Sequence, residues 1–140
     1  LSATRDTEEL RAQSQQMVGS LIRLLQELQP QIIPIIKALD KPYNYAIAFG
    51  IAAVNWEIDP TAALLGYLHS WVSNLITGGI KLIPLGQTAG QLLLLELQEL
   101  ISSATVEIMN LHDDELSCCS WGLSLASMGH EQQYTRLFRS

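Results

Sequence analysis

Apolar residues recur at intervals of three and four positions along most of this 140-residue chain, and this spacing constrains its fold most strongly. The spacing places apolar side chains on one face of an α-helix, whereas a half-buried strand needs apolar and polar residues in alternation. No alternating segment of useful length occurs in the sequence. Apolar residues make up 48% of the chain but aromatic residues only 6%, so leucine, isoleucine and alanine must supply the core. We therefore expect an all-α protein, built as an antiparallel helical bundle.

Capping residues and prolines set the expected helix boundaries. Asp6 and Glu9 have the spacing of a capping box, which begins a first helix. Asp59 followed by Pro60 is a second strong start, because the carboxylate can accept an unpaired backbone N–H and proline has no donor to leave unpaired. We expect Gln87 or Thr88 to cap the last long helix. The expected helices cover residues 7–28, 32–39, 43–56, 60–83 and 91–112.

The segment Pro60–Ile80 contains no Asp, Glu, Lys or Arg, and it is long enough to raise the question of a membrane span. Its pattern argues against a span, because serine, asparagine and threonine form a polar stripe that a lipid-facing helix would not carry. The apolar face is expected to consist of Leu64, Leu65, Leu68, Trp71, Val72, Leu75, Ile76 and Ile80. We therefore expect a buried or half-buried helix of a soluble protein, with no membrane partner.

The composition changes after the acidic run 113–115. Serine, cysteine and glycine then dominate, which indicates an irregular linker. A short helix is expected from about Ala126, with Met128, Tyr134, Leu137 and Phe138 as its apolar positions. We therefore expect a helical bundle domain over residues 1–116, followed by a linker and partner-binding tail over residues 117–140.

Charge and cysteine content limit the partners and the compartment. The formal net charge is −6 and no run of lysine or arginine occurs, so binding of nucleic acid through phosphates is not expected. Partners should be proteins. Cys118 and Cys119 are adjacent and form no disulfide framework, which favours a reducing, cytoplasmic location. The chain begins with Leu1 and not methionine, which suggests that it has been cut from a longer protein.

The sequence contains no recognisable catalytic or metal motif. No serine elbow, phosphate-binding loop or acid–base pair can be argued, so we expect neither enzyme activity nor a cofactor. The soft or borderline metal ligands are His69, His112, His130, Cys118 and Cys119, and none has the spacing of a known metal site. The alternative to a protein-binding function is a helical metal-binding chaperone that uses His130, His112, Cys118 and Cys119 directly.

Two segments instead have the composition of protein-binding surfaces. The corner at residues 84–91 has more amide and glycine residues than a turn requires, although a tight turn with capping side chains would also explain it. The tail combines arginine and aromatic residues, which are favoured at interface hot spots. The candidate partner-binding residues are Gly86, Gln87, Thr88, Gly90, Gln91, His130, Glu131, Tyr134, Arg136, Phe138 and Arg139.

Three blocks of the sequence resemble the urease accessory protein F (UreF) family. They are residues 7–17 (TEELRAQSQQM), 84–91 (PLGQTAGQ) and 126–140 (ASMGHEQQYTRLFRS), which stand in the family's order and span most of the chain. The resemblance implies an all-helical homodimer without catalytic activity. Because the N-terminal helices of the family have no counterpart here, the chain resembles the C-terminal portion of such a protein.

The resemblance also implies the partners. A UreF-type dimer would bridge a UreD-type protein (also called UreH) and the UreG-type GTPase, and this assembly would deliver nickel to apo-urease. The nickel would be carried mainly by the GTPase. Tyr134, Arg136, Phe138 and Arg139 would then be held in a groove of the UreD-type partner.

Overall fold

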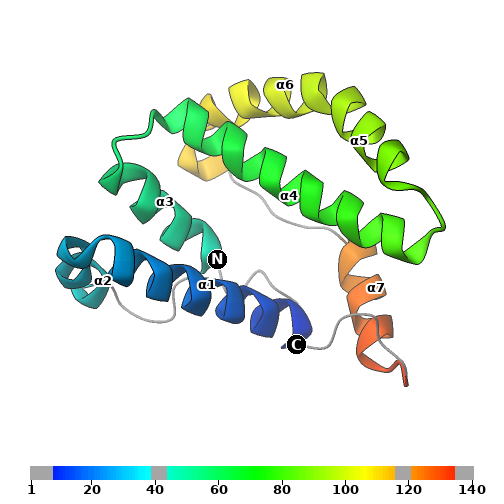
Figure 1. Ribbon diagram of the computed structural model, residues 1–140, viewed down its shortest axis with the longest axis horizontal. Helices are drawn as coiled ribbons and strands as arrows, with labels where there is room; N and C mark the ends of the chain where they lie inside the picture. Colours follow the sequence, from blue (N-terminus) through cyan, green and yellow to red (C-terminus); the bar gives the residue numbers. More distant parts are fainter. Residues whose placement is uncertain (1–7, 39–43, 116–120, 135–140) are drawn as a thin grey trace. The chain divides into compact units, whose positions relative to one another are not determined.

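The computed structural model describes residues 8–38, 44–115 and 121–134 of the chain. All regular structure in these ranges is helical, which confirms the expected all-α class. The elements are α1 (Glu8–Leu28), the 3-10 helix η2 (Pro30–Ile32), α2 (Ile33–Ala38), α3 (Tyr45–Asn55), α4 (Pro60–Leu82), α5 (Gln87–Glu96), α6 (Gln98–Met109), the 3-10 helix η3 (Asp113–Glu115) and α7 (Trp121–Glu131) (Figure 1). None of the helices within the described ranges has the length and apolar character needed to cross a membrane.

The chain divides into two compact units. Unit 1 combines Leu1–Asn55 with Ser117–Ser140 and therefore contains α1, α2, α3 and α7. Unit 2 is Trp56–Leu116 and contains α4, α5 and α6. The expected division into a bundle over residues 1–116 and a tail over residues 117–140 concerns function as well as structure, and it stays a prediction.

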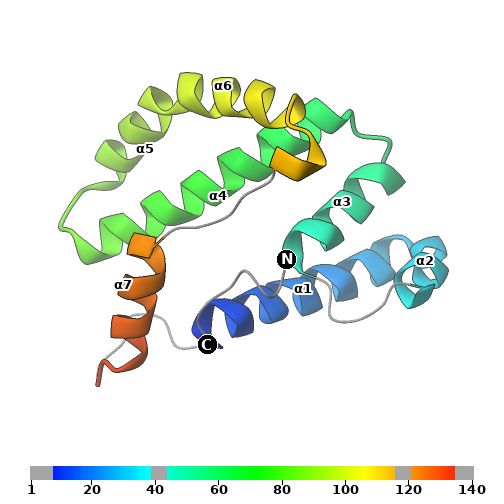
Figure 2. The same cartoon turned by 180° about the vertical axis from the view of Figure 1, so that it is seen from behind.

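The core of unit 1 lies between α1 and α3, which run side by side (Figure 1, Figure 2). Small side chains on α3 allow this packing, since Ala48, Ala52 and Ala53 are all buried. The short helices η2 and α2 add apolar residues after the two prolines. The core cluster consists of Val18, Ile22, Leu25, Ile32, Ile36, Ala48 and Ala52.

Unit 2 is a helical hairpin in which α4 runs antiparallel to α5 and α6 (Figure 1, Figure 2). Asp59 caps α4 as expected, because the Ala62 N–H donates to Asp59 Oδ1 at 3.0 Å. The expected apolar face of α4 is half-buried at Leu64, Leu68, Val72, Ile76 and Ile80, whereas Leu65, Trp71 and Leu75 are exposed and no residue of α4 is fully buried. A hairpin offers each helix only one neighbouring layer, and such a layer cannot enclose a broad apolar face.

The helix expected over residues 91–112 differs from the structure at its start and in its middle. Gly86 occupies the N-cap position of α5 and provides no side-chain cap, so the expected cap at Gln87 or Thr88 is wrong. Leu97 separates α5 from α6, with its N–H directed to the carbonyls of Leu93 and Leu95. The break occurs at a leucine and not at a proline or glycine, so the sequence carries no local signal for it.

The expected irregular linker also proves to be partly helical. α7 begins at Trp121, earlier than the expected start near Ala126, and it packs against α1. Its buried residues are Ser124 and Ser127, which lie three positions apart on one helical face. The serine content predicts irregular backbone, but here serine supplies small side chains to a buried helix face.

Candidate functional site

Backbone hydrogen bonds and the extended backbone of Ile83 define the corner between α4 and α5. The Ile83 N–H donates to the Gly79 carbonyl at 2.9 Å and ends α4, and Ile83 itself has extended dihedral angles of −108° and 133°. This conformation is the one that a following proline requires, and Pro84 follows. The Gly90 N–H then donates to the Gly86 carbonyl at 3.3 Å in the first turn of α5. Leu85 and Gly86 therefore form a short, exposed connection between the two helices.

Gly90 has a packing function within unit 2. It is the only buried residue of α5, and a Cβ atom placed on it would lie 3.2 Å from both Ile76 Cγ2 and Ile80 Cγ2. Those distances are shorter than ordinary van der Waals contact. The absence of a side chain at Gly90 therefore lets α5 approach α4. The sequence predicts Gly90 only as a partner-binding residue and does not reveal this contact.

The other predicted binding residues of the corner face solvent. Gly86, Gln87, Thr88 and Gln91 are exposed. Gln87 and Gln91 lie four positions apart at the start of α5, so their side chains share one face of the helix. Two amides on one face, each with donor and acceptor atoms, can hydrogen-bond an extended main chain of another protein.

The end of α7 carries the described part of the predicted tail site. His130 and Glu131 are half-buried in the last turn of α7. The Gln133 N–H donates to the His130 carbonyl at 3.0 Å and closes the helix. Tyr134 lies beyond this turn and has a relative exposure of 102%. Its ring therefore has no place in the core of the protein.

The remaining predicted tail residues, Arg136, Phe138 and Arg139, lie outside the described residues. The same holds for Cys118 and Cys119, on which the metal-binding alternative depends. His112 is exposed, and its backbone N–H donates to Glu115 Oε2 at 2.8 Å. Within the described ranges, no group of three or more His, Cys, Asp or Glu side chains is arranged to hold a metal ion.

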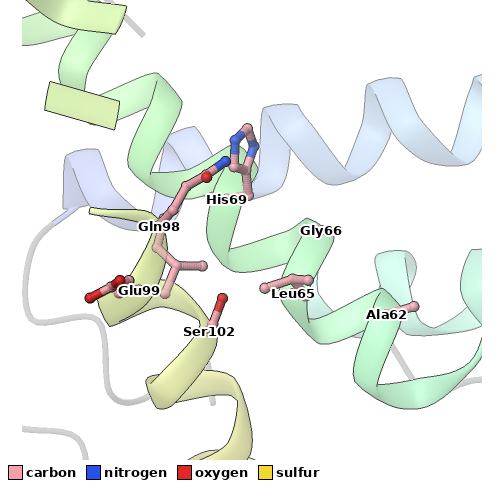
Figure 3. A pocket seen from close by; sticks show the side chains of 8 residues that line it. Ala62, Leu65, Gly66, His69, Gln98, Glu99 and Ser102 are labelled. Carbon is pink, nitrogen blue, oxygen red and sulfur yellow. The ribbon is translucent and has the colours of Figure 1, made fainter. Parts of the chain in front are cut away.

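The structure adds a groove that the sequence did not predict. It lies in unit 2 between the N-terminal half of α4 and the first turns of α6, with a volume of about 710 Å³ (Figure 3). Leu65 and Ser102 point into the space between the two helices (Figure 3). The groove is lined by Ala62, Leu65, Gly66, His69, Gln98, Glu99, Ile101 and Ser102. These residues are far apart in sequence, and only the pairing of α4 with α6 brings them together.

Comparison with known proteins decides the family. The sequence model of the UreF family matches residues 1–98. The chain belongs to the UreF family. The matched range includes the corner but ends before α7, so the likeness of the tail rests on individual relatives.

Relatives from several bacteria align with the whole of this family member. It is 70% identical over 140 residues to the urease accessory protein UreF of Nostoc sp., an alignment that covers 100% of this chain and 61% of the relative. It is 57% identical over 142 residues to the urease accessory protein UreF of Synechocystis sp., an alignment that covers 100% of this chain and 60% of that relative. The urease accessory protein UreF of Chromohalobacter salexigens is 39% identical to it over 140 residues, and this alignment also covers 100% of this chain and 60% of the relative. The chain thus spans about 61% of the length of the Nostoc relative.

Proposed function

We propose that this UreF-family chain functions as an adaptor in urease maturation. It would bridge a UreD/UreH-type protein and the UreG-type GTPase as a cytoplasmic homodimer, and so support nickel insertion into apo-urease. It would contribute no catalytic group. Its role would be to position the GTPase and couple nucleotide hydrolysis to nickel release.

The observation that carries this proposal is the 70% identity, along the whole chain, to a protein named urease accessory protein UreF. The surface of the molecule is consistent with an adaptor. Trp121 has a relative exposure of 76% and Tyr134 of 102%, and both lie on or beside α7. Aromatic side chains exposed to this degree are typical of a surface that a protein partner covers.

The proposal is tested by assembly. The chain is mixed with the UreD/UreH-type and UreG-type proteins, and the mass of the complex is measured by light scattering coupled to size-exclusion chromatography. We expect a species that contains all three proteins, with two copies of this chain. A mixture in which each protein elutes at its own mass would contradict the proposal.

The tail provides a sharper prediction. Arg139→Ala or Phe138→Ala should weaken binding to the UreD/UreH-type protein by about 2 kcal/mol, or about 30-fold in Kd, because arginine and aromatic anchors dominate interface energies. Binding can be measured by isothermal titration calorimetry. Arg23→Ala is the matched control, since Arg23 is an exposed arginine on α1. If the tail variants bind as tightly as the Arg23→Ala protein, the tail is not the anchor.

Direct nickel binding is the alternative that the same protein can test. A metal-binding chaperone would bind nickel stoichiometrically through His112, His130, Cys118 and Cys119. Calorimetric titration of the isolated chain with nickel distinguishes the two functions. Tight binding that is abolished when these four side chains are replaced would favour the chaperone over the adaptor.

A further inference from the structure

The groove between α4 and α6 is open along the surface of unit 2. Seven of its eight lining residues are exposed, and only Ile101 is buried. Its large apolar lining residues are the buried Ile101 on α6 and the exposed Leu65 on α4. Gln98, Glu99 and Ser102 supply polar groups on the α6 wall. An open groove lined by both apolar and polar residues fits an elongated occupant better than an enclosed small molecule.

On the α4 side, the groove is lined in part by small residues. Ala62 and Gly66 are four positions apart, so they lie on the same helical face. A Cβ atom placed on Gly66 would meet no atom within 4 Å. The backbone of α4 is therefore accessible at this point, and another helix can approach it closely.

The charge of unit 2 indicates the chemistry of the occupant. Trp56–Leu116 contains eight acidic residues and one basic residue, Lys81, so its formal charge is −7, whereas the whole chain has a charge of −6. The rest of the chain is therefore nearly neutral. Glu99 lies on the groove, and Glu96 and Glu107 are exposed on the same α5–α6 segment. A basic partner would be attracted to this surface, whereas an acidic one would be repelled.

We infer that the groove between α4 and α6 is a docking site for a basic amphipathic helix of a partner protein. The apolar face of that helix covers Leu65 and Ile101 and approaches α4 at Gly66. Its lysine or arginine residues lie against Glu99 and the neighbouring acids. The inference does not depend on a role in urease maturation, because it rests on the shape and charge of this surface alone.

The first test uses two synthetic peptides and the full chain. One peptide is an amphipathic helix of leucine, alanine and lysine, and the other carries glutamate in place of lysine. Each peptide is labelled with a fluorophore, and binding is followed by fluorescence anisotropy. The lysine peptide should bind, with an affinity that falls as salt is added, and the glutamate peptide should bind at least about tenfold more weakly.

Variants then locate the binding site. Gly66→Leu fills the groove without a clash at Cβ and should weaken binding of the lysine peptide by about tenfold, or about 1.4 kcal/mol. Gly79→Leu is its control, because Gly79 is also on α4, has no atom within 4 Å of an added Cβ and does not line the groove. Glu99→Lys should weaken binding, whereas Glu107→Lys, on the same helix but outside the groove, should have a smaller effect. Circular dichroism checks that each variant is folded.

Three results would overturn the inference. The first is equal binding of the lysine and glutamate peptides, which would remove the argument from charge. The second is equal affinity of the Gly66→Leu and Gly79→Leu proteins, which would place the peptide elsewhere. The third comes from sedimentation without peptide: a wild-type dimer that Gly66→Leu converts to a monomer would show that a second copy of the chain occupies the groove.

Discussion

Two glycines of unit 2 illustrate how differently the same residue type can function. Gly90 is buried against Ile76 and Ile80, whereas Gly66 faces open space on the groove. Both stand inside helices, where glycine costs about 1 kcal/mol relative to alanine. At Gly90 the cost is offset by the closer packing of α5 on α4. At Gly66 no contact within the described residues offsets it, which is consistent with a surface kept open for a partner.

This difference predicts opposite effects on stability. Gly90→Val should lower the free energy of unfolding by about 1–3 kcal/mol, because the added side chain collides with both isoleucines. Gly66→Ala should raise it by about 0.5–1 kcal/mol, because only helix propensity changes. Both values can be measured by urea unfolding followed by circular dichroism. Equal effects at the two positions would show that the α4–α5 contact at Gly90 is not close.

At the scale of the element, α7 exposes the side chains that a helix usually buries. Ser124 and Ser127 are buried, while Trp121, Leu123, Leu125 and Met128 are exposed. A helix that presents four large apolar residues to solvent loses much of the free energy that burial would supply. A partner that covered this surface would recover that free energy, which agrees with the proposed role of the C-terminal segment.

The docking of α7 can be tested through its buried face. Ser124→Leu should detach α7 from α1, because a leucine does not fit the space of a buried serine, and should lower the free energy of unfolding by about 1–3 kcal/mol. Leu125→Ser is the control, since Leu125 has a relative exposure of 64%. Hydrogen exchange of the α7 amides would report the detachment directly. Unchanged protection in Ser124→Leu would contradict the packing described for α7.

At the scale of the molecule, net charge opposes the association that exposed apolar surface favours. Large apolar side chains are exposed on both units, including Leu24 and Val54 on unit 1 and Trp71 and Leu100 on unit 2. The formal charge of −6 at neutral pH gives repulsion between copies. In the isolated chain, charge repulsion between copies therefore opposes attraction between their exposed apolar surfaces.

Lowering the pH should shift this balance. As the pH falls towards the sequence pI of about 4.9, the net charge rises from −6 towards zero, and copies of the chain should associate. Dynamic light scattering between neutral pH and the pI measures this as an increase in hydrodynamic radius. Addition of about 1 M salt at neutral pH is the control, because it screens charge without protonation and should also promote association. A constant radius in both experiments would show that the exposed apolar surface is not adhesive.

The sequence by itself determined the helical class, the start of α4 at Asp59 and Pro60, the course of α1, and the resemblance to the UreF family. The first three depend on interactions within about four residues along the chain, such as a cap or a helical period, and a sequence displays those directly. The resemblance depends on the residue identities of three blocks, which can be compared without a structure. The tertiary structure alone decided the close contact at Gly90, the exposure of Trp71 and Leu75 on α4, the serine face of α7 and the groove beside Gly66. Each of these depends on which distant segment lies opposite, and local sequence does not encode that pairing in a form that spacing rules can detect.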